Sequence, residues 1–381
     1  MTATAPATAP AQPSGSASKA PVLGPFRGGT QPTVRQTGFS KTITLDTATT
    51  DLEDYEIAPT NILRCIYVEV KATTSGNSAD VAFTADAPLN ILSTVNFQDA
   101  GGTSIVGSFD SFALSMGMKY FGYSQAGDPR NNAVYSVTTG TGATGGSFNV
   151  VFRIPVEAVN RTGVGSLMNQ TTNSPYVLSL TVNKSGNVYS TAPTTEPVVK
   201  VTVRLGGYWN GANAGFQPAP TAFGSTQYIN RASIQGLNGS SDFQLPNNGL
   251  GNPLRNLLFM NYTTSAPARS SADFPDPLQI NYKGNMLVQY DQNVWHYDMS
   301  EAFGLAGTID TGTGLDTGVF TLPFNRDFGL EPGAELGLGY LNTNVGDEIE
   351  LVGSWAASCT LYELVNFISV KGSLSQIQGL V

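Results

Sequence analysis

One run of sequence elements occurs in both halves of this chain. The first copy begins at Asn90 and consists of NILSTVNF, a DAGG turn, TSIVGS and an aromatic segment with helical spacing. The second copy begins at Leu278 and repeats this order as LQINY, KGN, MLVQYD and VWHYDMSEAF. Each copy predicts two strands joined by a tight turn and followed by one short helix. The duplication therefore predicts two similar β-rich domains in tandem.

Length and composition agree with two β-rich domains. The chain has 381 residues, which is more than one hydrophobic core usually serves. Charged residues make up only 12%, about half of the usual share, and 42 Gly and 22 Pro residues interrupt the chain often. This profile is typical of short strands and many turns. A surface so poor in charge is either polar and uncharged or covered by partners.

The strand pattern predicts an all-β chain. The clearest strand, in residues 61–73, places Ile66, Val68 and Val70 on one face and Tyr67 and Glu69 on the other. Each half offers roughly eight short strands, which predicts two tandem eight-stranded jelly rolls (a double jelly roll), each with a short helix. Greek-key sandwiches of another topology would produce the same pattern.

Pro-rich and Gly-rich stretches predict the domain boundaries. Residues 1–36 are low in large apolar side chains and predict an extended, flexible N-terminal arm. Residues 209–225 predict a linker. We therefore expect the first jelly roll at residues 37–215 and the second, with a C-terminal tail, at residues 216–381.

The two aromatic helices are predicted to pack through apolar faces. In the first helix, apolar residues recur at helical spacing, and Ser108 is the expected N-cap. In the second helix, Asn293 is the expected cap. The residues expected to pack these helices against their domains are Phe112, Met116, Trp295 and Met299.

Charge is unevenly distributed along the chain. The first 45 residues contain four basic residues and no acidic residue, whereas the rest carries 15 basic and 28 acidic residues. The acidic body argues against sequence-specific nucleic-acid binding. The arm residues Lys19, Arg27 and Arg35 are predicted to contact a neighbouring copy or anionic lipid. The alternative is a solvated tail.

Few residues suggest chemistry. His296 is the only histidine, and Cys65 and Cys359 each lie in an apolar segment as expected buried free thiols, with a disulfide as the alternative. Four acids lie within predicted strands without an evident partner: Glu69, Glu348, Glu350 and Glu363. We predict no enzymatic activity, no cofactor and no metal site, with a calcium site in the loop at 310–316 or among Asp51, Glu53 and Asp54 as the alternative.

Three stretches carry a resemblance to a known family. These are residues 152–183, the Trp295 helix followed by residues 316–329, and residues 342–366. Together they resemble the double jelly-roll major capsid proteins of tectivirus-type bacteriophages. Members often have an amphipathic N-terminal helix facing a membrane, and residues 1–36 depart from that pattern because repeated Pro prevents such a helix.

The resemblance implies a structural major capsid protein. It implies a homotrimeric, pseudo-hexagonal capsomer that tiles an icosahedral shell around an internal membrane and genome. Penton and minor capsid proteins are then further partners, the virion is the location, and synthesis takes place in the host cytoplasm. The loops at 124–146 and 306–318 are candidates for outward towers or rims.

Two other functions remain as alternatives. A carbohydrate-binding or adhesive β-sandwich protein would expose aromatic residues on one sheet face, and its candidates are Trp209, Trp295 and Trp355. A minor virion spike protein would share the fold and differ in copy number per particle.

Overall fold

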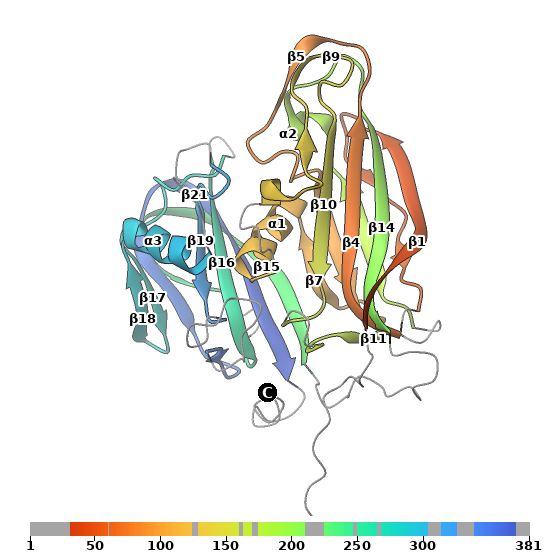
Figure 1. Ribbon diagram of the computed structural model, residues 1–381. Coiled ribbons are helices and arrows are strands. Elements are labelled where there is room, and N and C mark those ends of the chain that lie inside the picture. The colour runs from red at the N-terminus through yellow and green to blue at the C-terminus, as the bar shows by residue number, and fades with distance from the viewer. Residues whose placement is uncertain are drawn as a thin grey trace, which may run out of the picture.

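Two β-sandwiches lie side by side in the computed structural model (Figure 1). The structure describes residues 31–59, 61–123, 129–159, 163–169, 174–209, 225–246, 250–264, 268–303, 314–325 and 339–370. The predicted arm up to residue 30, the linker at 210–224, the C-terminal tail at 371–381 and parts of both predicted tower loops lie outside the described residues. No helix among the described residues is long and apolar enough to cross a membrane.

The first half contains one large antiparallel sheet facing a second sheet. The large sheet has the order β1-β14-β4-β10-β8, with β11 paired to β4. Its strands are β1 (Gln31–Thr44), β4 (Asn61–Thr73), β8 (Ser136–Val137), β10 (Phe148–Pro155), β11 (Leu167–Asn169) and β14 (Val198–Trp209). The opposing strands are β2 (Thr50–Asp51), β3 (Tyr55–Glu56), β6 (Leu92–Gln98), β7 (Ser104–Phe109) and β12 (Val177–Val182).

Smaller elements complete this half. A three-stranded sheet is formed by β5 (Asn77–Phe83), β9 (Gly140–Gly142) and β13 (Tyr189–Thr191). The helical segments are α1 (Ser111–Tyr120), η1 (Pro129–Asn131) and α2 (Ser185–Val188).

The second half repeats the plan of the first. Its elements are β15 (Ser225–Gln244), β16 (Pro253–Thr263), β17 (Leu278–Tyr282), β18 (Asn285–Tyr290), α3 (Gln292–Phe303), β19 (Val319–Pro323), β20 (Leu341–Asn342) and β21 (Ile349–Val370). The order β15-β21-β16-β19 corresponds to β1-β14-β4-β10, and every pairing in both series is antiparallel. The unit β17-β18-α3 likewise corresponds to β6-β7-α1. The predicted duplication of strand, turn, strand and helix is confirmed.

The alternating pattern of β4 explains how the first sheet covers its core. Ile66, Val68 and Val70 are fully buried, while Tyr67 and Glu69 on the other face are partly exposed. By contrast, β16 is buried on both faces for most of its length. Two consecutive residues of β16, Arg255 and Asn256, hydrogen-bond backbone groups of the first half.

Three sequence predictions need correction. The helix α3 begins at Gln292, so Asn293 lies inside it and is not its N-cap. The N-cap of α1 is Asp110 and not Ser108, because β7 runs to Phe109 and the amide of Ala113 then donates to Asp110 Oδ1 at 2.8 Å. The strand β1 begins at Gln31, so Arg35 lies in the first sheet opposite Leu205 and not in the arm. Cys65 and Cys359 are both buried free thiols.

Candidate functional site: the junction between the two halves

The helix α1 is the centre of the junction between the halves. It lies between the two sandwiches (Figure 1), and each of its ten residues is buried. A helix on the outside of a domain shows one apolar stripe, whereas a helix covered on all sides has no solvent face. The single stripe predicted for α1 therefore describes only the side that packs on its own domain.

Side chains from the second half bind the C-terminal end of α1. Asn256 Nδ2 donates to the carbonyl oxygen of Tyr120 at 3.1 Å, and an Arg255 Nη donates to that of Phe121 at 2.7 Å. The last carbonyl groups of a helix have no partner within the helix. Two residues of β16 thus hydrogen-bond backbone carbonyl groups at this end of the helix.

Arg255 connects three parts of the junction. It is fully buried, and its guanidinium also donates to Asn366 Oδ1 at 3.0 Å and lies 5.1 Å from the ring centroid of Tyr123. The hydroxyl of Tyr123 hydrogen-bonds Gln227 Oε1 at 2.8 Å. A buried network of this kind stabilises one relative placement of the halves, because each displaced member would leave a polar group unsatisfied.

Three ion pairs of the described residues join the first half to the second. Lys119 Nζ lies 2.5 Å from Asp316 Oδ1, and the Lys119 side chain is only 2% exposed. The other two pairs are Arg269 with Asp86 at 2.8 Å and Arg231 with Asp110 at 3.3 Å. These contacts add charge pairing to the apolar packing around α1.

Glu157 anchors the connection that follows β10. Its carboxylate lies 2.8 Å from Arg64 Nε and accepts a hydrogen bond from the Tyr208 hydroxyl at 2.8 Å. Burial, followed by the Glu157 charge, raises the pKa of Tyr208 well above its ordinary value. The backbone carbonyl of Glu157 accepts from Gln227 Nε2 at 3.1 Å, which ties this cluster to the second half.

The candidate catalytic residues do not converge. His296 stacks on the Phe320 ring, with centroids 5.4 Å apart and planes 12° apart. Glu69 pairs with Arg204 at 2.6 Å. Glu363 is buried in β21, where desolvation raises the pKa of its carboxyl group to about 8. Among the described residues, no group of three or more His, Cys, Asp or Glu side chains could hold a metal ion.

Comparison with solved structures reveals a common fold over nearly the whole chain. The MCP of STIV (Sulfolobus Turreted Icosahedral Virus) matches with a TM-score of 0.63 at 14% identity, covering 90% of this chain and 97% of that chain. The major capsid protein P2 from bacteriophage PM2 matches with a TM-score of 0.54 at 9% identity, covering 90% and 99%. The chain has the double jelly-roll fold. A chain of the PBCV-1 virus capsid also matches, with a TM-score of 0.52 at 11% identity and coverage of 89% and 93%. No protein-family model and no curated protein sequence matches the chain.

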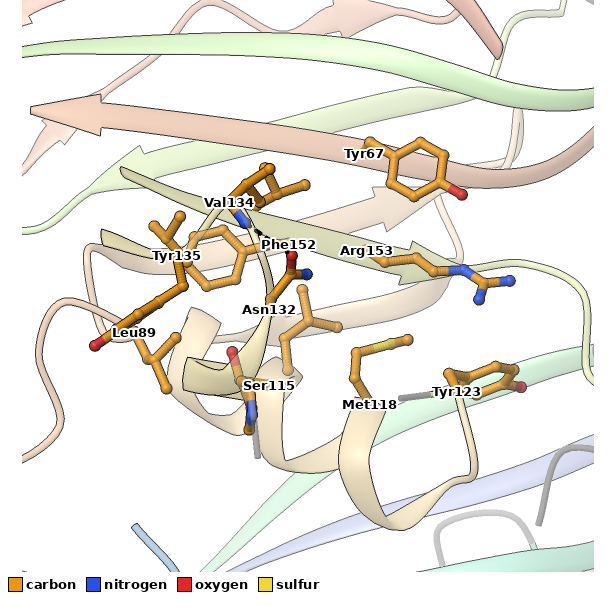
Figure 2. Close-up of a pocket in the computed structure, with 14 residues that line it drawn as sticks. Tyr67, Leu89, Ser115, Met118, Tyr123, Asn132, Val134, Tyr135, Phe152 and Arg153 are labelled. Atoms are coloured by element: carbon orange, nitrogen blue, oxygen red, sulfur yellow. Dashed lines mark hydrogen bonds between the residues drawn. The ribbon is translucent and has the colours of Figure 1, made fainter. Parts of the chain in front are cut away.

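The double jelly roll has one described cavity beside α1, of about 290 Å³ (Figure 2). It lies between α1, β10 and the segment that starts at η1, and Arg153 points across it toward Tyr123, with 5.4 Å from guanidinium to ring centroid. Its described lining contains no Asp, Glu, His or Cys. The hydroxyl groups of Ser115 and three tyrosines in that lining therefore have no carboxylate, imidazole or thiol beside them in it to activate them.

The residues predicted to pack the two helices are all in buried positions. Phe112 and Met116 are 1% and 0% exposed, and Trp295 and Met299 are each 1% exposed. Lys19 and Arg27 lie outside the described residues. The sequence pattern did not indicate Arg255, because an arginine within a strand more often faces solvent than a domain junction.

Proposed function

We propose that this chain is a structural major capsid protein whose copies assemble into an icosahedral shell. The observation that carries this proposal is the match in both directions: about nine-tenths of this chain aligns with almost the whole length of solved capsid proteins. The double jelly roll is thus the whole architecture shared with these proteins and not one module of a larger match.

The internal repeat supports a trimeric capsomer. Each chain contributes two jelly rolls with the same strand order. Three chains around a three-fold axis place six similar domains in a ring, which gives a pseudo-hexagonal outline suited to tiling a closed surface. The buried junction around Arg255 and Lys119 makes each chain a rigid pair of domains, as such a tile requires.

Further partners follow from the same proposal. Within a virion, the capsomers would meet penton and minor capsid proteins and enclose an internal membrane and the genome. Lys19 and Arg27 would contact a neighbouring copy or anionic lipid. Arg35 would contact a neighbouring copy or anionic lipid from the edge strand β1. The chain would be made in the host cytoplasm and function in the virion shell.

A glycan-binding function has less support. That function calls for exposed tryptophans on a sheet face, whereas Trp295 and Trp355 are each 1% exposed. The Trp209 side chain lies outside the described residues.

A minor spike protein would differ from a major capsid protein in copy number. A major shell protein dominates the protein content of purified particles, whereas a spike protein contributes little of it.

Light scattering coupled to size-exclusion chromatography tests the proposal. We expect a stable species of three times 40.1 kDa, and hexagonal capsomers or shells in negative-stain images. A strictly monomeric protein at all concentrations, with no assembled particles, would overturn it.

A further inference from the structure

We propose that neighbouring copies join by repeating, between chains, the contact that joins the two halves within one chain. The β18–α3 unit of one copy takes the β1 edge of the next copy, with Leu287 beside Val34. This inference rests on the proposed assembly and specifies which surfaces form it.

The first step is the equivalence of β1 and β15. The sequences FRIP in β10 and FTLP in β19 end at Pro155 and Pro323. From Pro155, the registered partners across the sheet are Cys65, Gly206 and finally Val34 on β1. From Pro323, they are Asn256, Asn366 and finally Ile229 on β15. Val34 and Ile229 therefore occupy the same position in their jelly rolls.

The second step is the equivalence of β7 and β18. Each strand leads into its helix through an aspartate, whose carbonyl accepts the same helical hydrogen bond: Leu114 N to Asp110 O at 3.1 Å, and Trp295 N to Asp291 O at 2.9 Å. Counting back equally from both aspartates, Leu287 corresponds to Val106.

Within one chain, the positions of Ile229 and Val106 are in contact. Ile229 of β15 pairs in parallel with Val106 of β7, and this pairing joins the sheets of the two halves. The equivalent contact would pair Val34 with Leu287. One chain cannot make it, because β1 and β18 are the end strands of their sheets and lie on opposite sides of the molecule (Figure 1). Only a second copy can bring β1 to β18.

The exposed fractions differ between the two sets of equivalent residues. The set at the junction within the chain is covered, and the equivalent set on β1, β18 and α3 is open to solvent. In the covered version, Ile229, Ile105, Val106, Ala113 and Met116 are between 0% and 2% exposed. Their equivalents in the open version are five of the eight large hydrophobic residues that are exposed in the described part of the chain: Val34 at 61%, Met286 at 61%, Leu287 at 39%, Val294 at 53% and Tyr297 at 72%. Four of these exposed residues lie on the β18–α3 unit and the fifth on the β1 edge, and exposed apolar side chains gathered on one such unit mark an interface.

The strand edges lead to the same conclusion. An open edge strand invites pairing with another chain unless charged residues or Pro protect it. The sequence of β18, NMLVQY, contains neither, whereas β1 carries Pro32 and Arg35 on either side of Val34, so β18 is the unprotected edge of the pair. Because the contact joins two different surfaces, it runs head to tail and closes into a ring when the rotation between copies is one third of a turn.

Disulfide trapping tests the contact directly. Neighbouring strands lie about 4.8 Å apart, which a disulfide can bridge. The native thiols Cys65 and Cys359 are both fully buried and leave a low background. We expect the double variant Val34→Cys/Leu287→Cys to oxidise to covalent trimers on non-reducing gels. A reassembled mixture of the two single variants should stop at covalent dimers, because each chain then carries a cysteine at only one of its two joints and a mixed ring has one joint with both cysteines.

A matched control uses another exposed valine. Val345 is 89% exposed and lies outside the proposed contact. The pair Val345→Cys/Leu287→Cys should stay monomeric on the same gel. Efficient trapping of this control pair, or no trapping of Val34→Cys/Leu287→Cys in a protein that is a trimer by light scattering, would overturn the contact and leave the capsid proposal standing.

A charged substitution tests the contact between Val34 and Leu287 independently of the proposed capsid function. Leu287→Asp places a carboxylate at the joint but in solvent in the free chain, so the circular dichroism spectrum and melting temperature of the monomer should not change. We expect the concentration for half-assembly to rise at least tenfold, which for a monomer–trimer equilibrium is about 2.8 kcal/mol over the three contacts of the ring. Val345→Asp should not change it. Wild-type protein that never assembles would instead contradict the proposed function itself.

Discussion

Lys119 Nζ lies 2.5 Å from Asp316 Oδ1, although 197 residues separate the two in the chain. The hydroxyl of Tyr120 donates to the same carboxylate oxygen at 2.6 Å. Asp316 therefore satisfies two donors at the end of α1 from the other half of the molecule. This relationship shows how the halves are held as one body.

Removing Asp316 should destabilise the folded chain. Asp316→Ala leaves the Lys119 ammonium buried without its partner, and we expect a loss of about 3 kcal/mol in the free energy of unfolding, measured by urea titration. The double variant Lys119→Met/Asp316→Leu should recover most of this loss, because no charge then remains buried. As a control, Lys41→Ala removes an exposed pair with Glu53 and should leave the urea midpoint unchanged. Equal midpoints for Asp316→Ala and Lys41→Ala would show that the buried pair contributes nothing.

Two aromatic residues on α3 should separate stability from assembly. Trp295 is 1% exposed and contacts the rings of Phe274, Tyr290 and Phe320, so Trp295→Ala should cost about 3–5 kcal/mol of stability. Tyr297 is 72% exposed, so Tyr297→Ala should leave the melting temperature of the free chain unchanged but weaken trimer formation. Calorimetry and light scattering on the same two samples test both expectations. The idea fails if Tyr297→Ala assembles as wild type does and also melts earlier.

The buried carboxyl of Glu363 predicts a pH dependence of stability. Its pKa is raised from 4.5 to about 8 by desolvation, so the folded chain keeps a proton that the unfolded chain releases above about pH 4.5. Stability contributed by this group is complete below that pH and falls as the pH rises toward 8, by at most about 1.4 kcal/mol per unit.

Glu363→Gln should remove this decline. Relative to wild type, we expect the variant to gain up to about 3 kcal/mol at pH 7 and little at pH 4, measured by urea unfolding across that range. Glu363→Asp is the matched control, since it keeps a titrating carboxyl group and should keep the slope. A slope that Glu363→Gln leaves intact would assign the pH dependence to other groups.

The N-terminal arm should act in shells and not in trimers. Because β1 begins at Gln31, deletion of residues 1–30 spares the strand and should leave trimers of normal size. We expect shell yield in negative-stain images to drop sharply. Full-length Lys19→Glu/Arg27→Glu should show the same defect if charge carries the contact, and it should also lose binding to anionic vesicles if lipid is the partner. Normal shells from the truncated protein would contradict this role.

Local sequence patterns predicted much of the fold. Alternation in residues 61–73 identified the strand and its buried face, because successive side chains of a strand point to opposite sides. The paired strand–turn–strand–helix units indicated two like domains, and aromatic spacing identified Phe112, Met116, Trp295 and Met299 as buried. These properties depend on neighbours along the chain.

Other properties depend on partners that are distant in the sequence. Ser108 and Asp110 are both suitable N-caps, and the extent of β7 decided between them. Arg35 was predicted to lie in the arm, because its neighbours in the sequence do not show that β1 pairs with the distant strand β14. The surroundings of Arg255 arise only when α1 and β21 meet β16.

Periodicity and turn residues act locally, so they were enough to predict two β-rich domains, the faces of their strands and their helices, but not the strand order that separates a jelly roll from another sandwich. Which apolar residues are covered depends on how the two halves pack together. Val106 and Leu287 occupy equivalent strands and are both aliphatic, yet one is 0% and the other 39% exposed. The physical reason is that a chain with two halves has only one internal junction. The second half covers the β7 edge of the first, whereas the equivalent β18 edge has no third domain of the same chain to cover it.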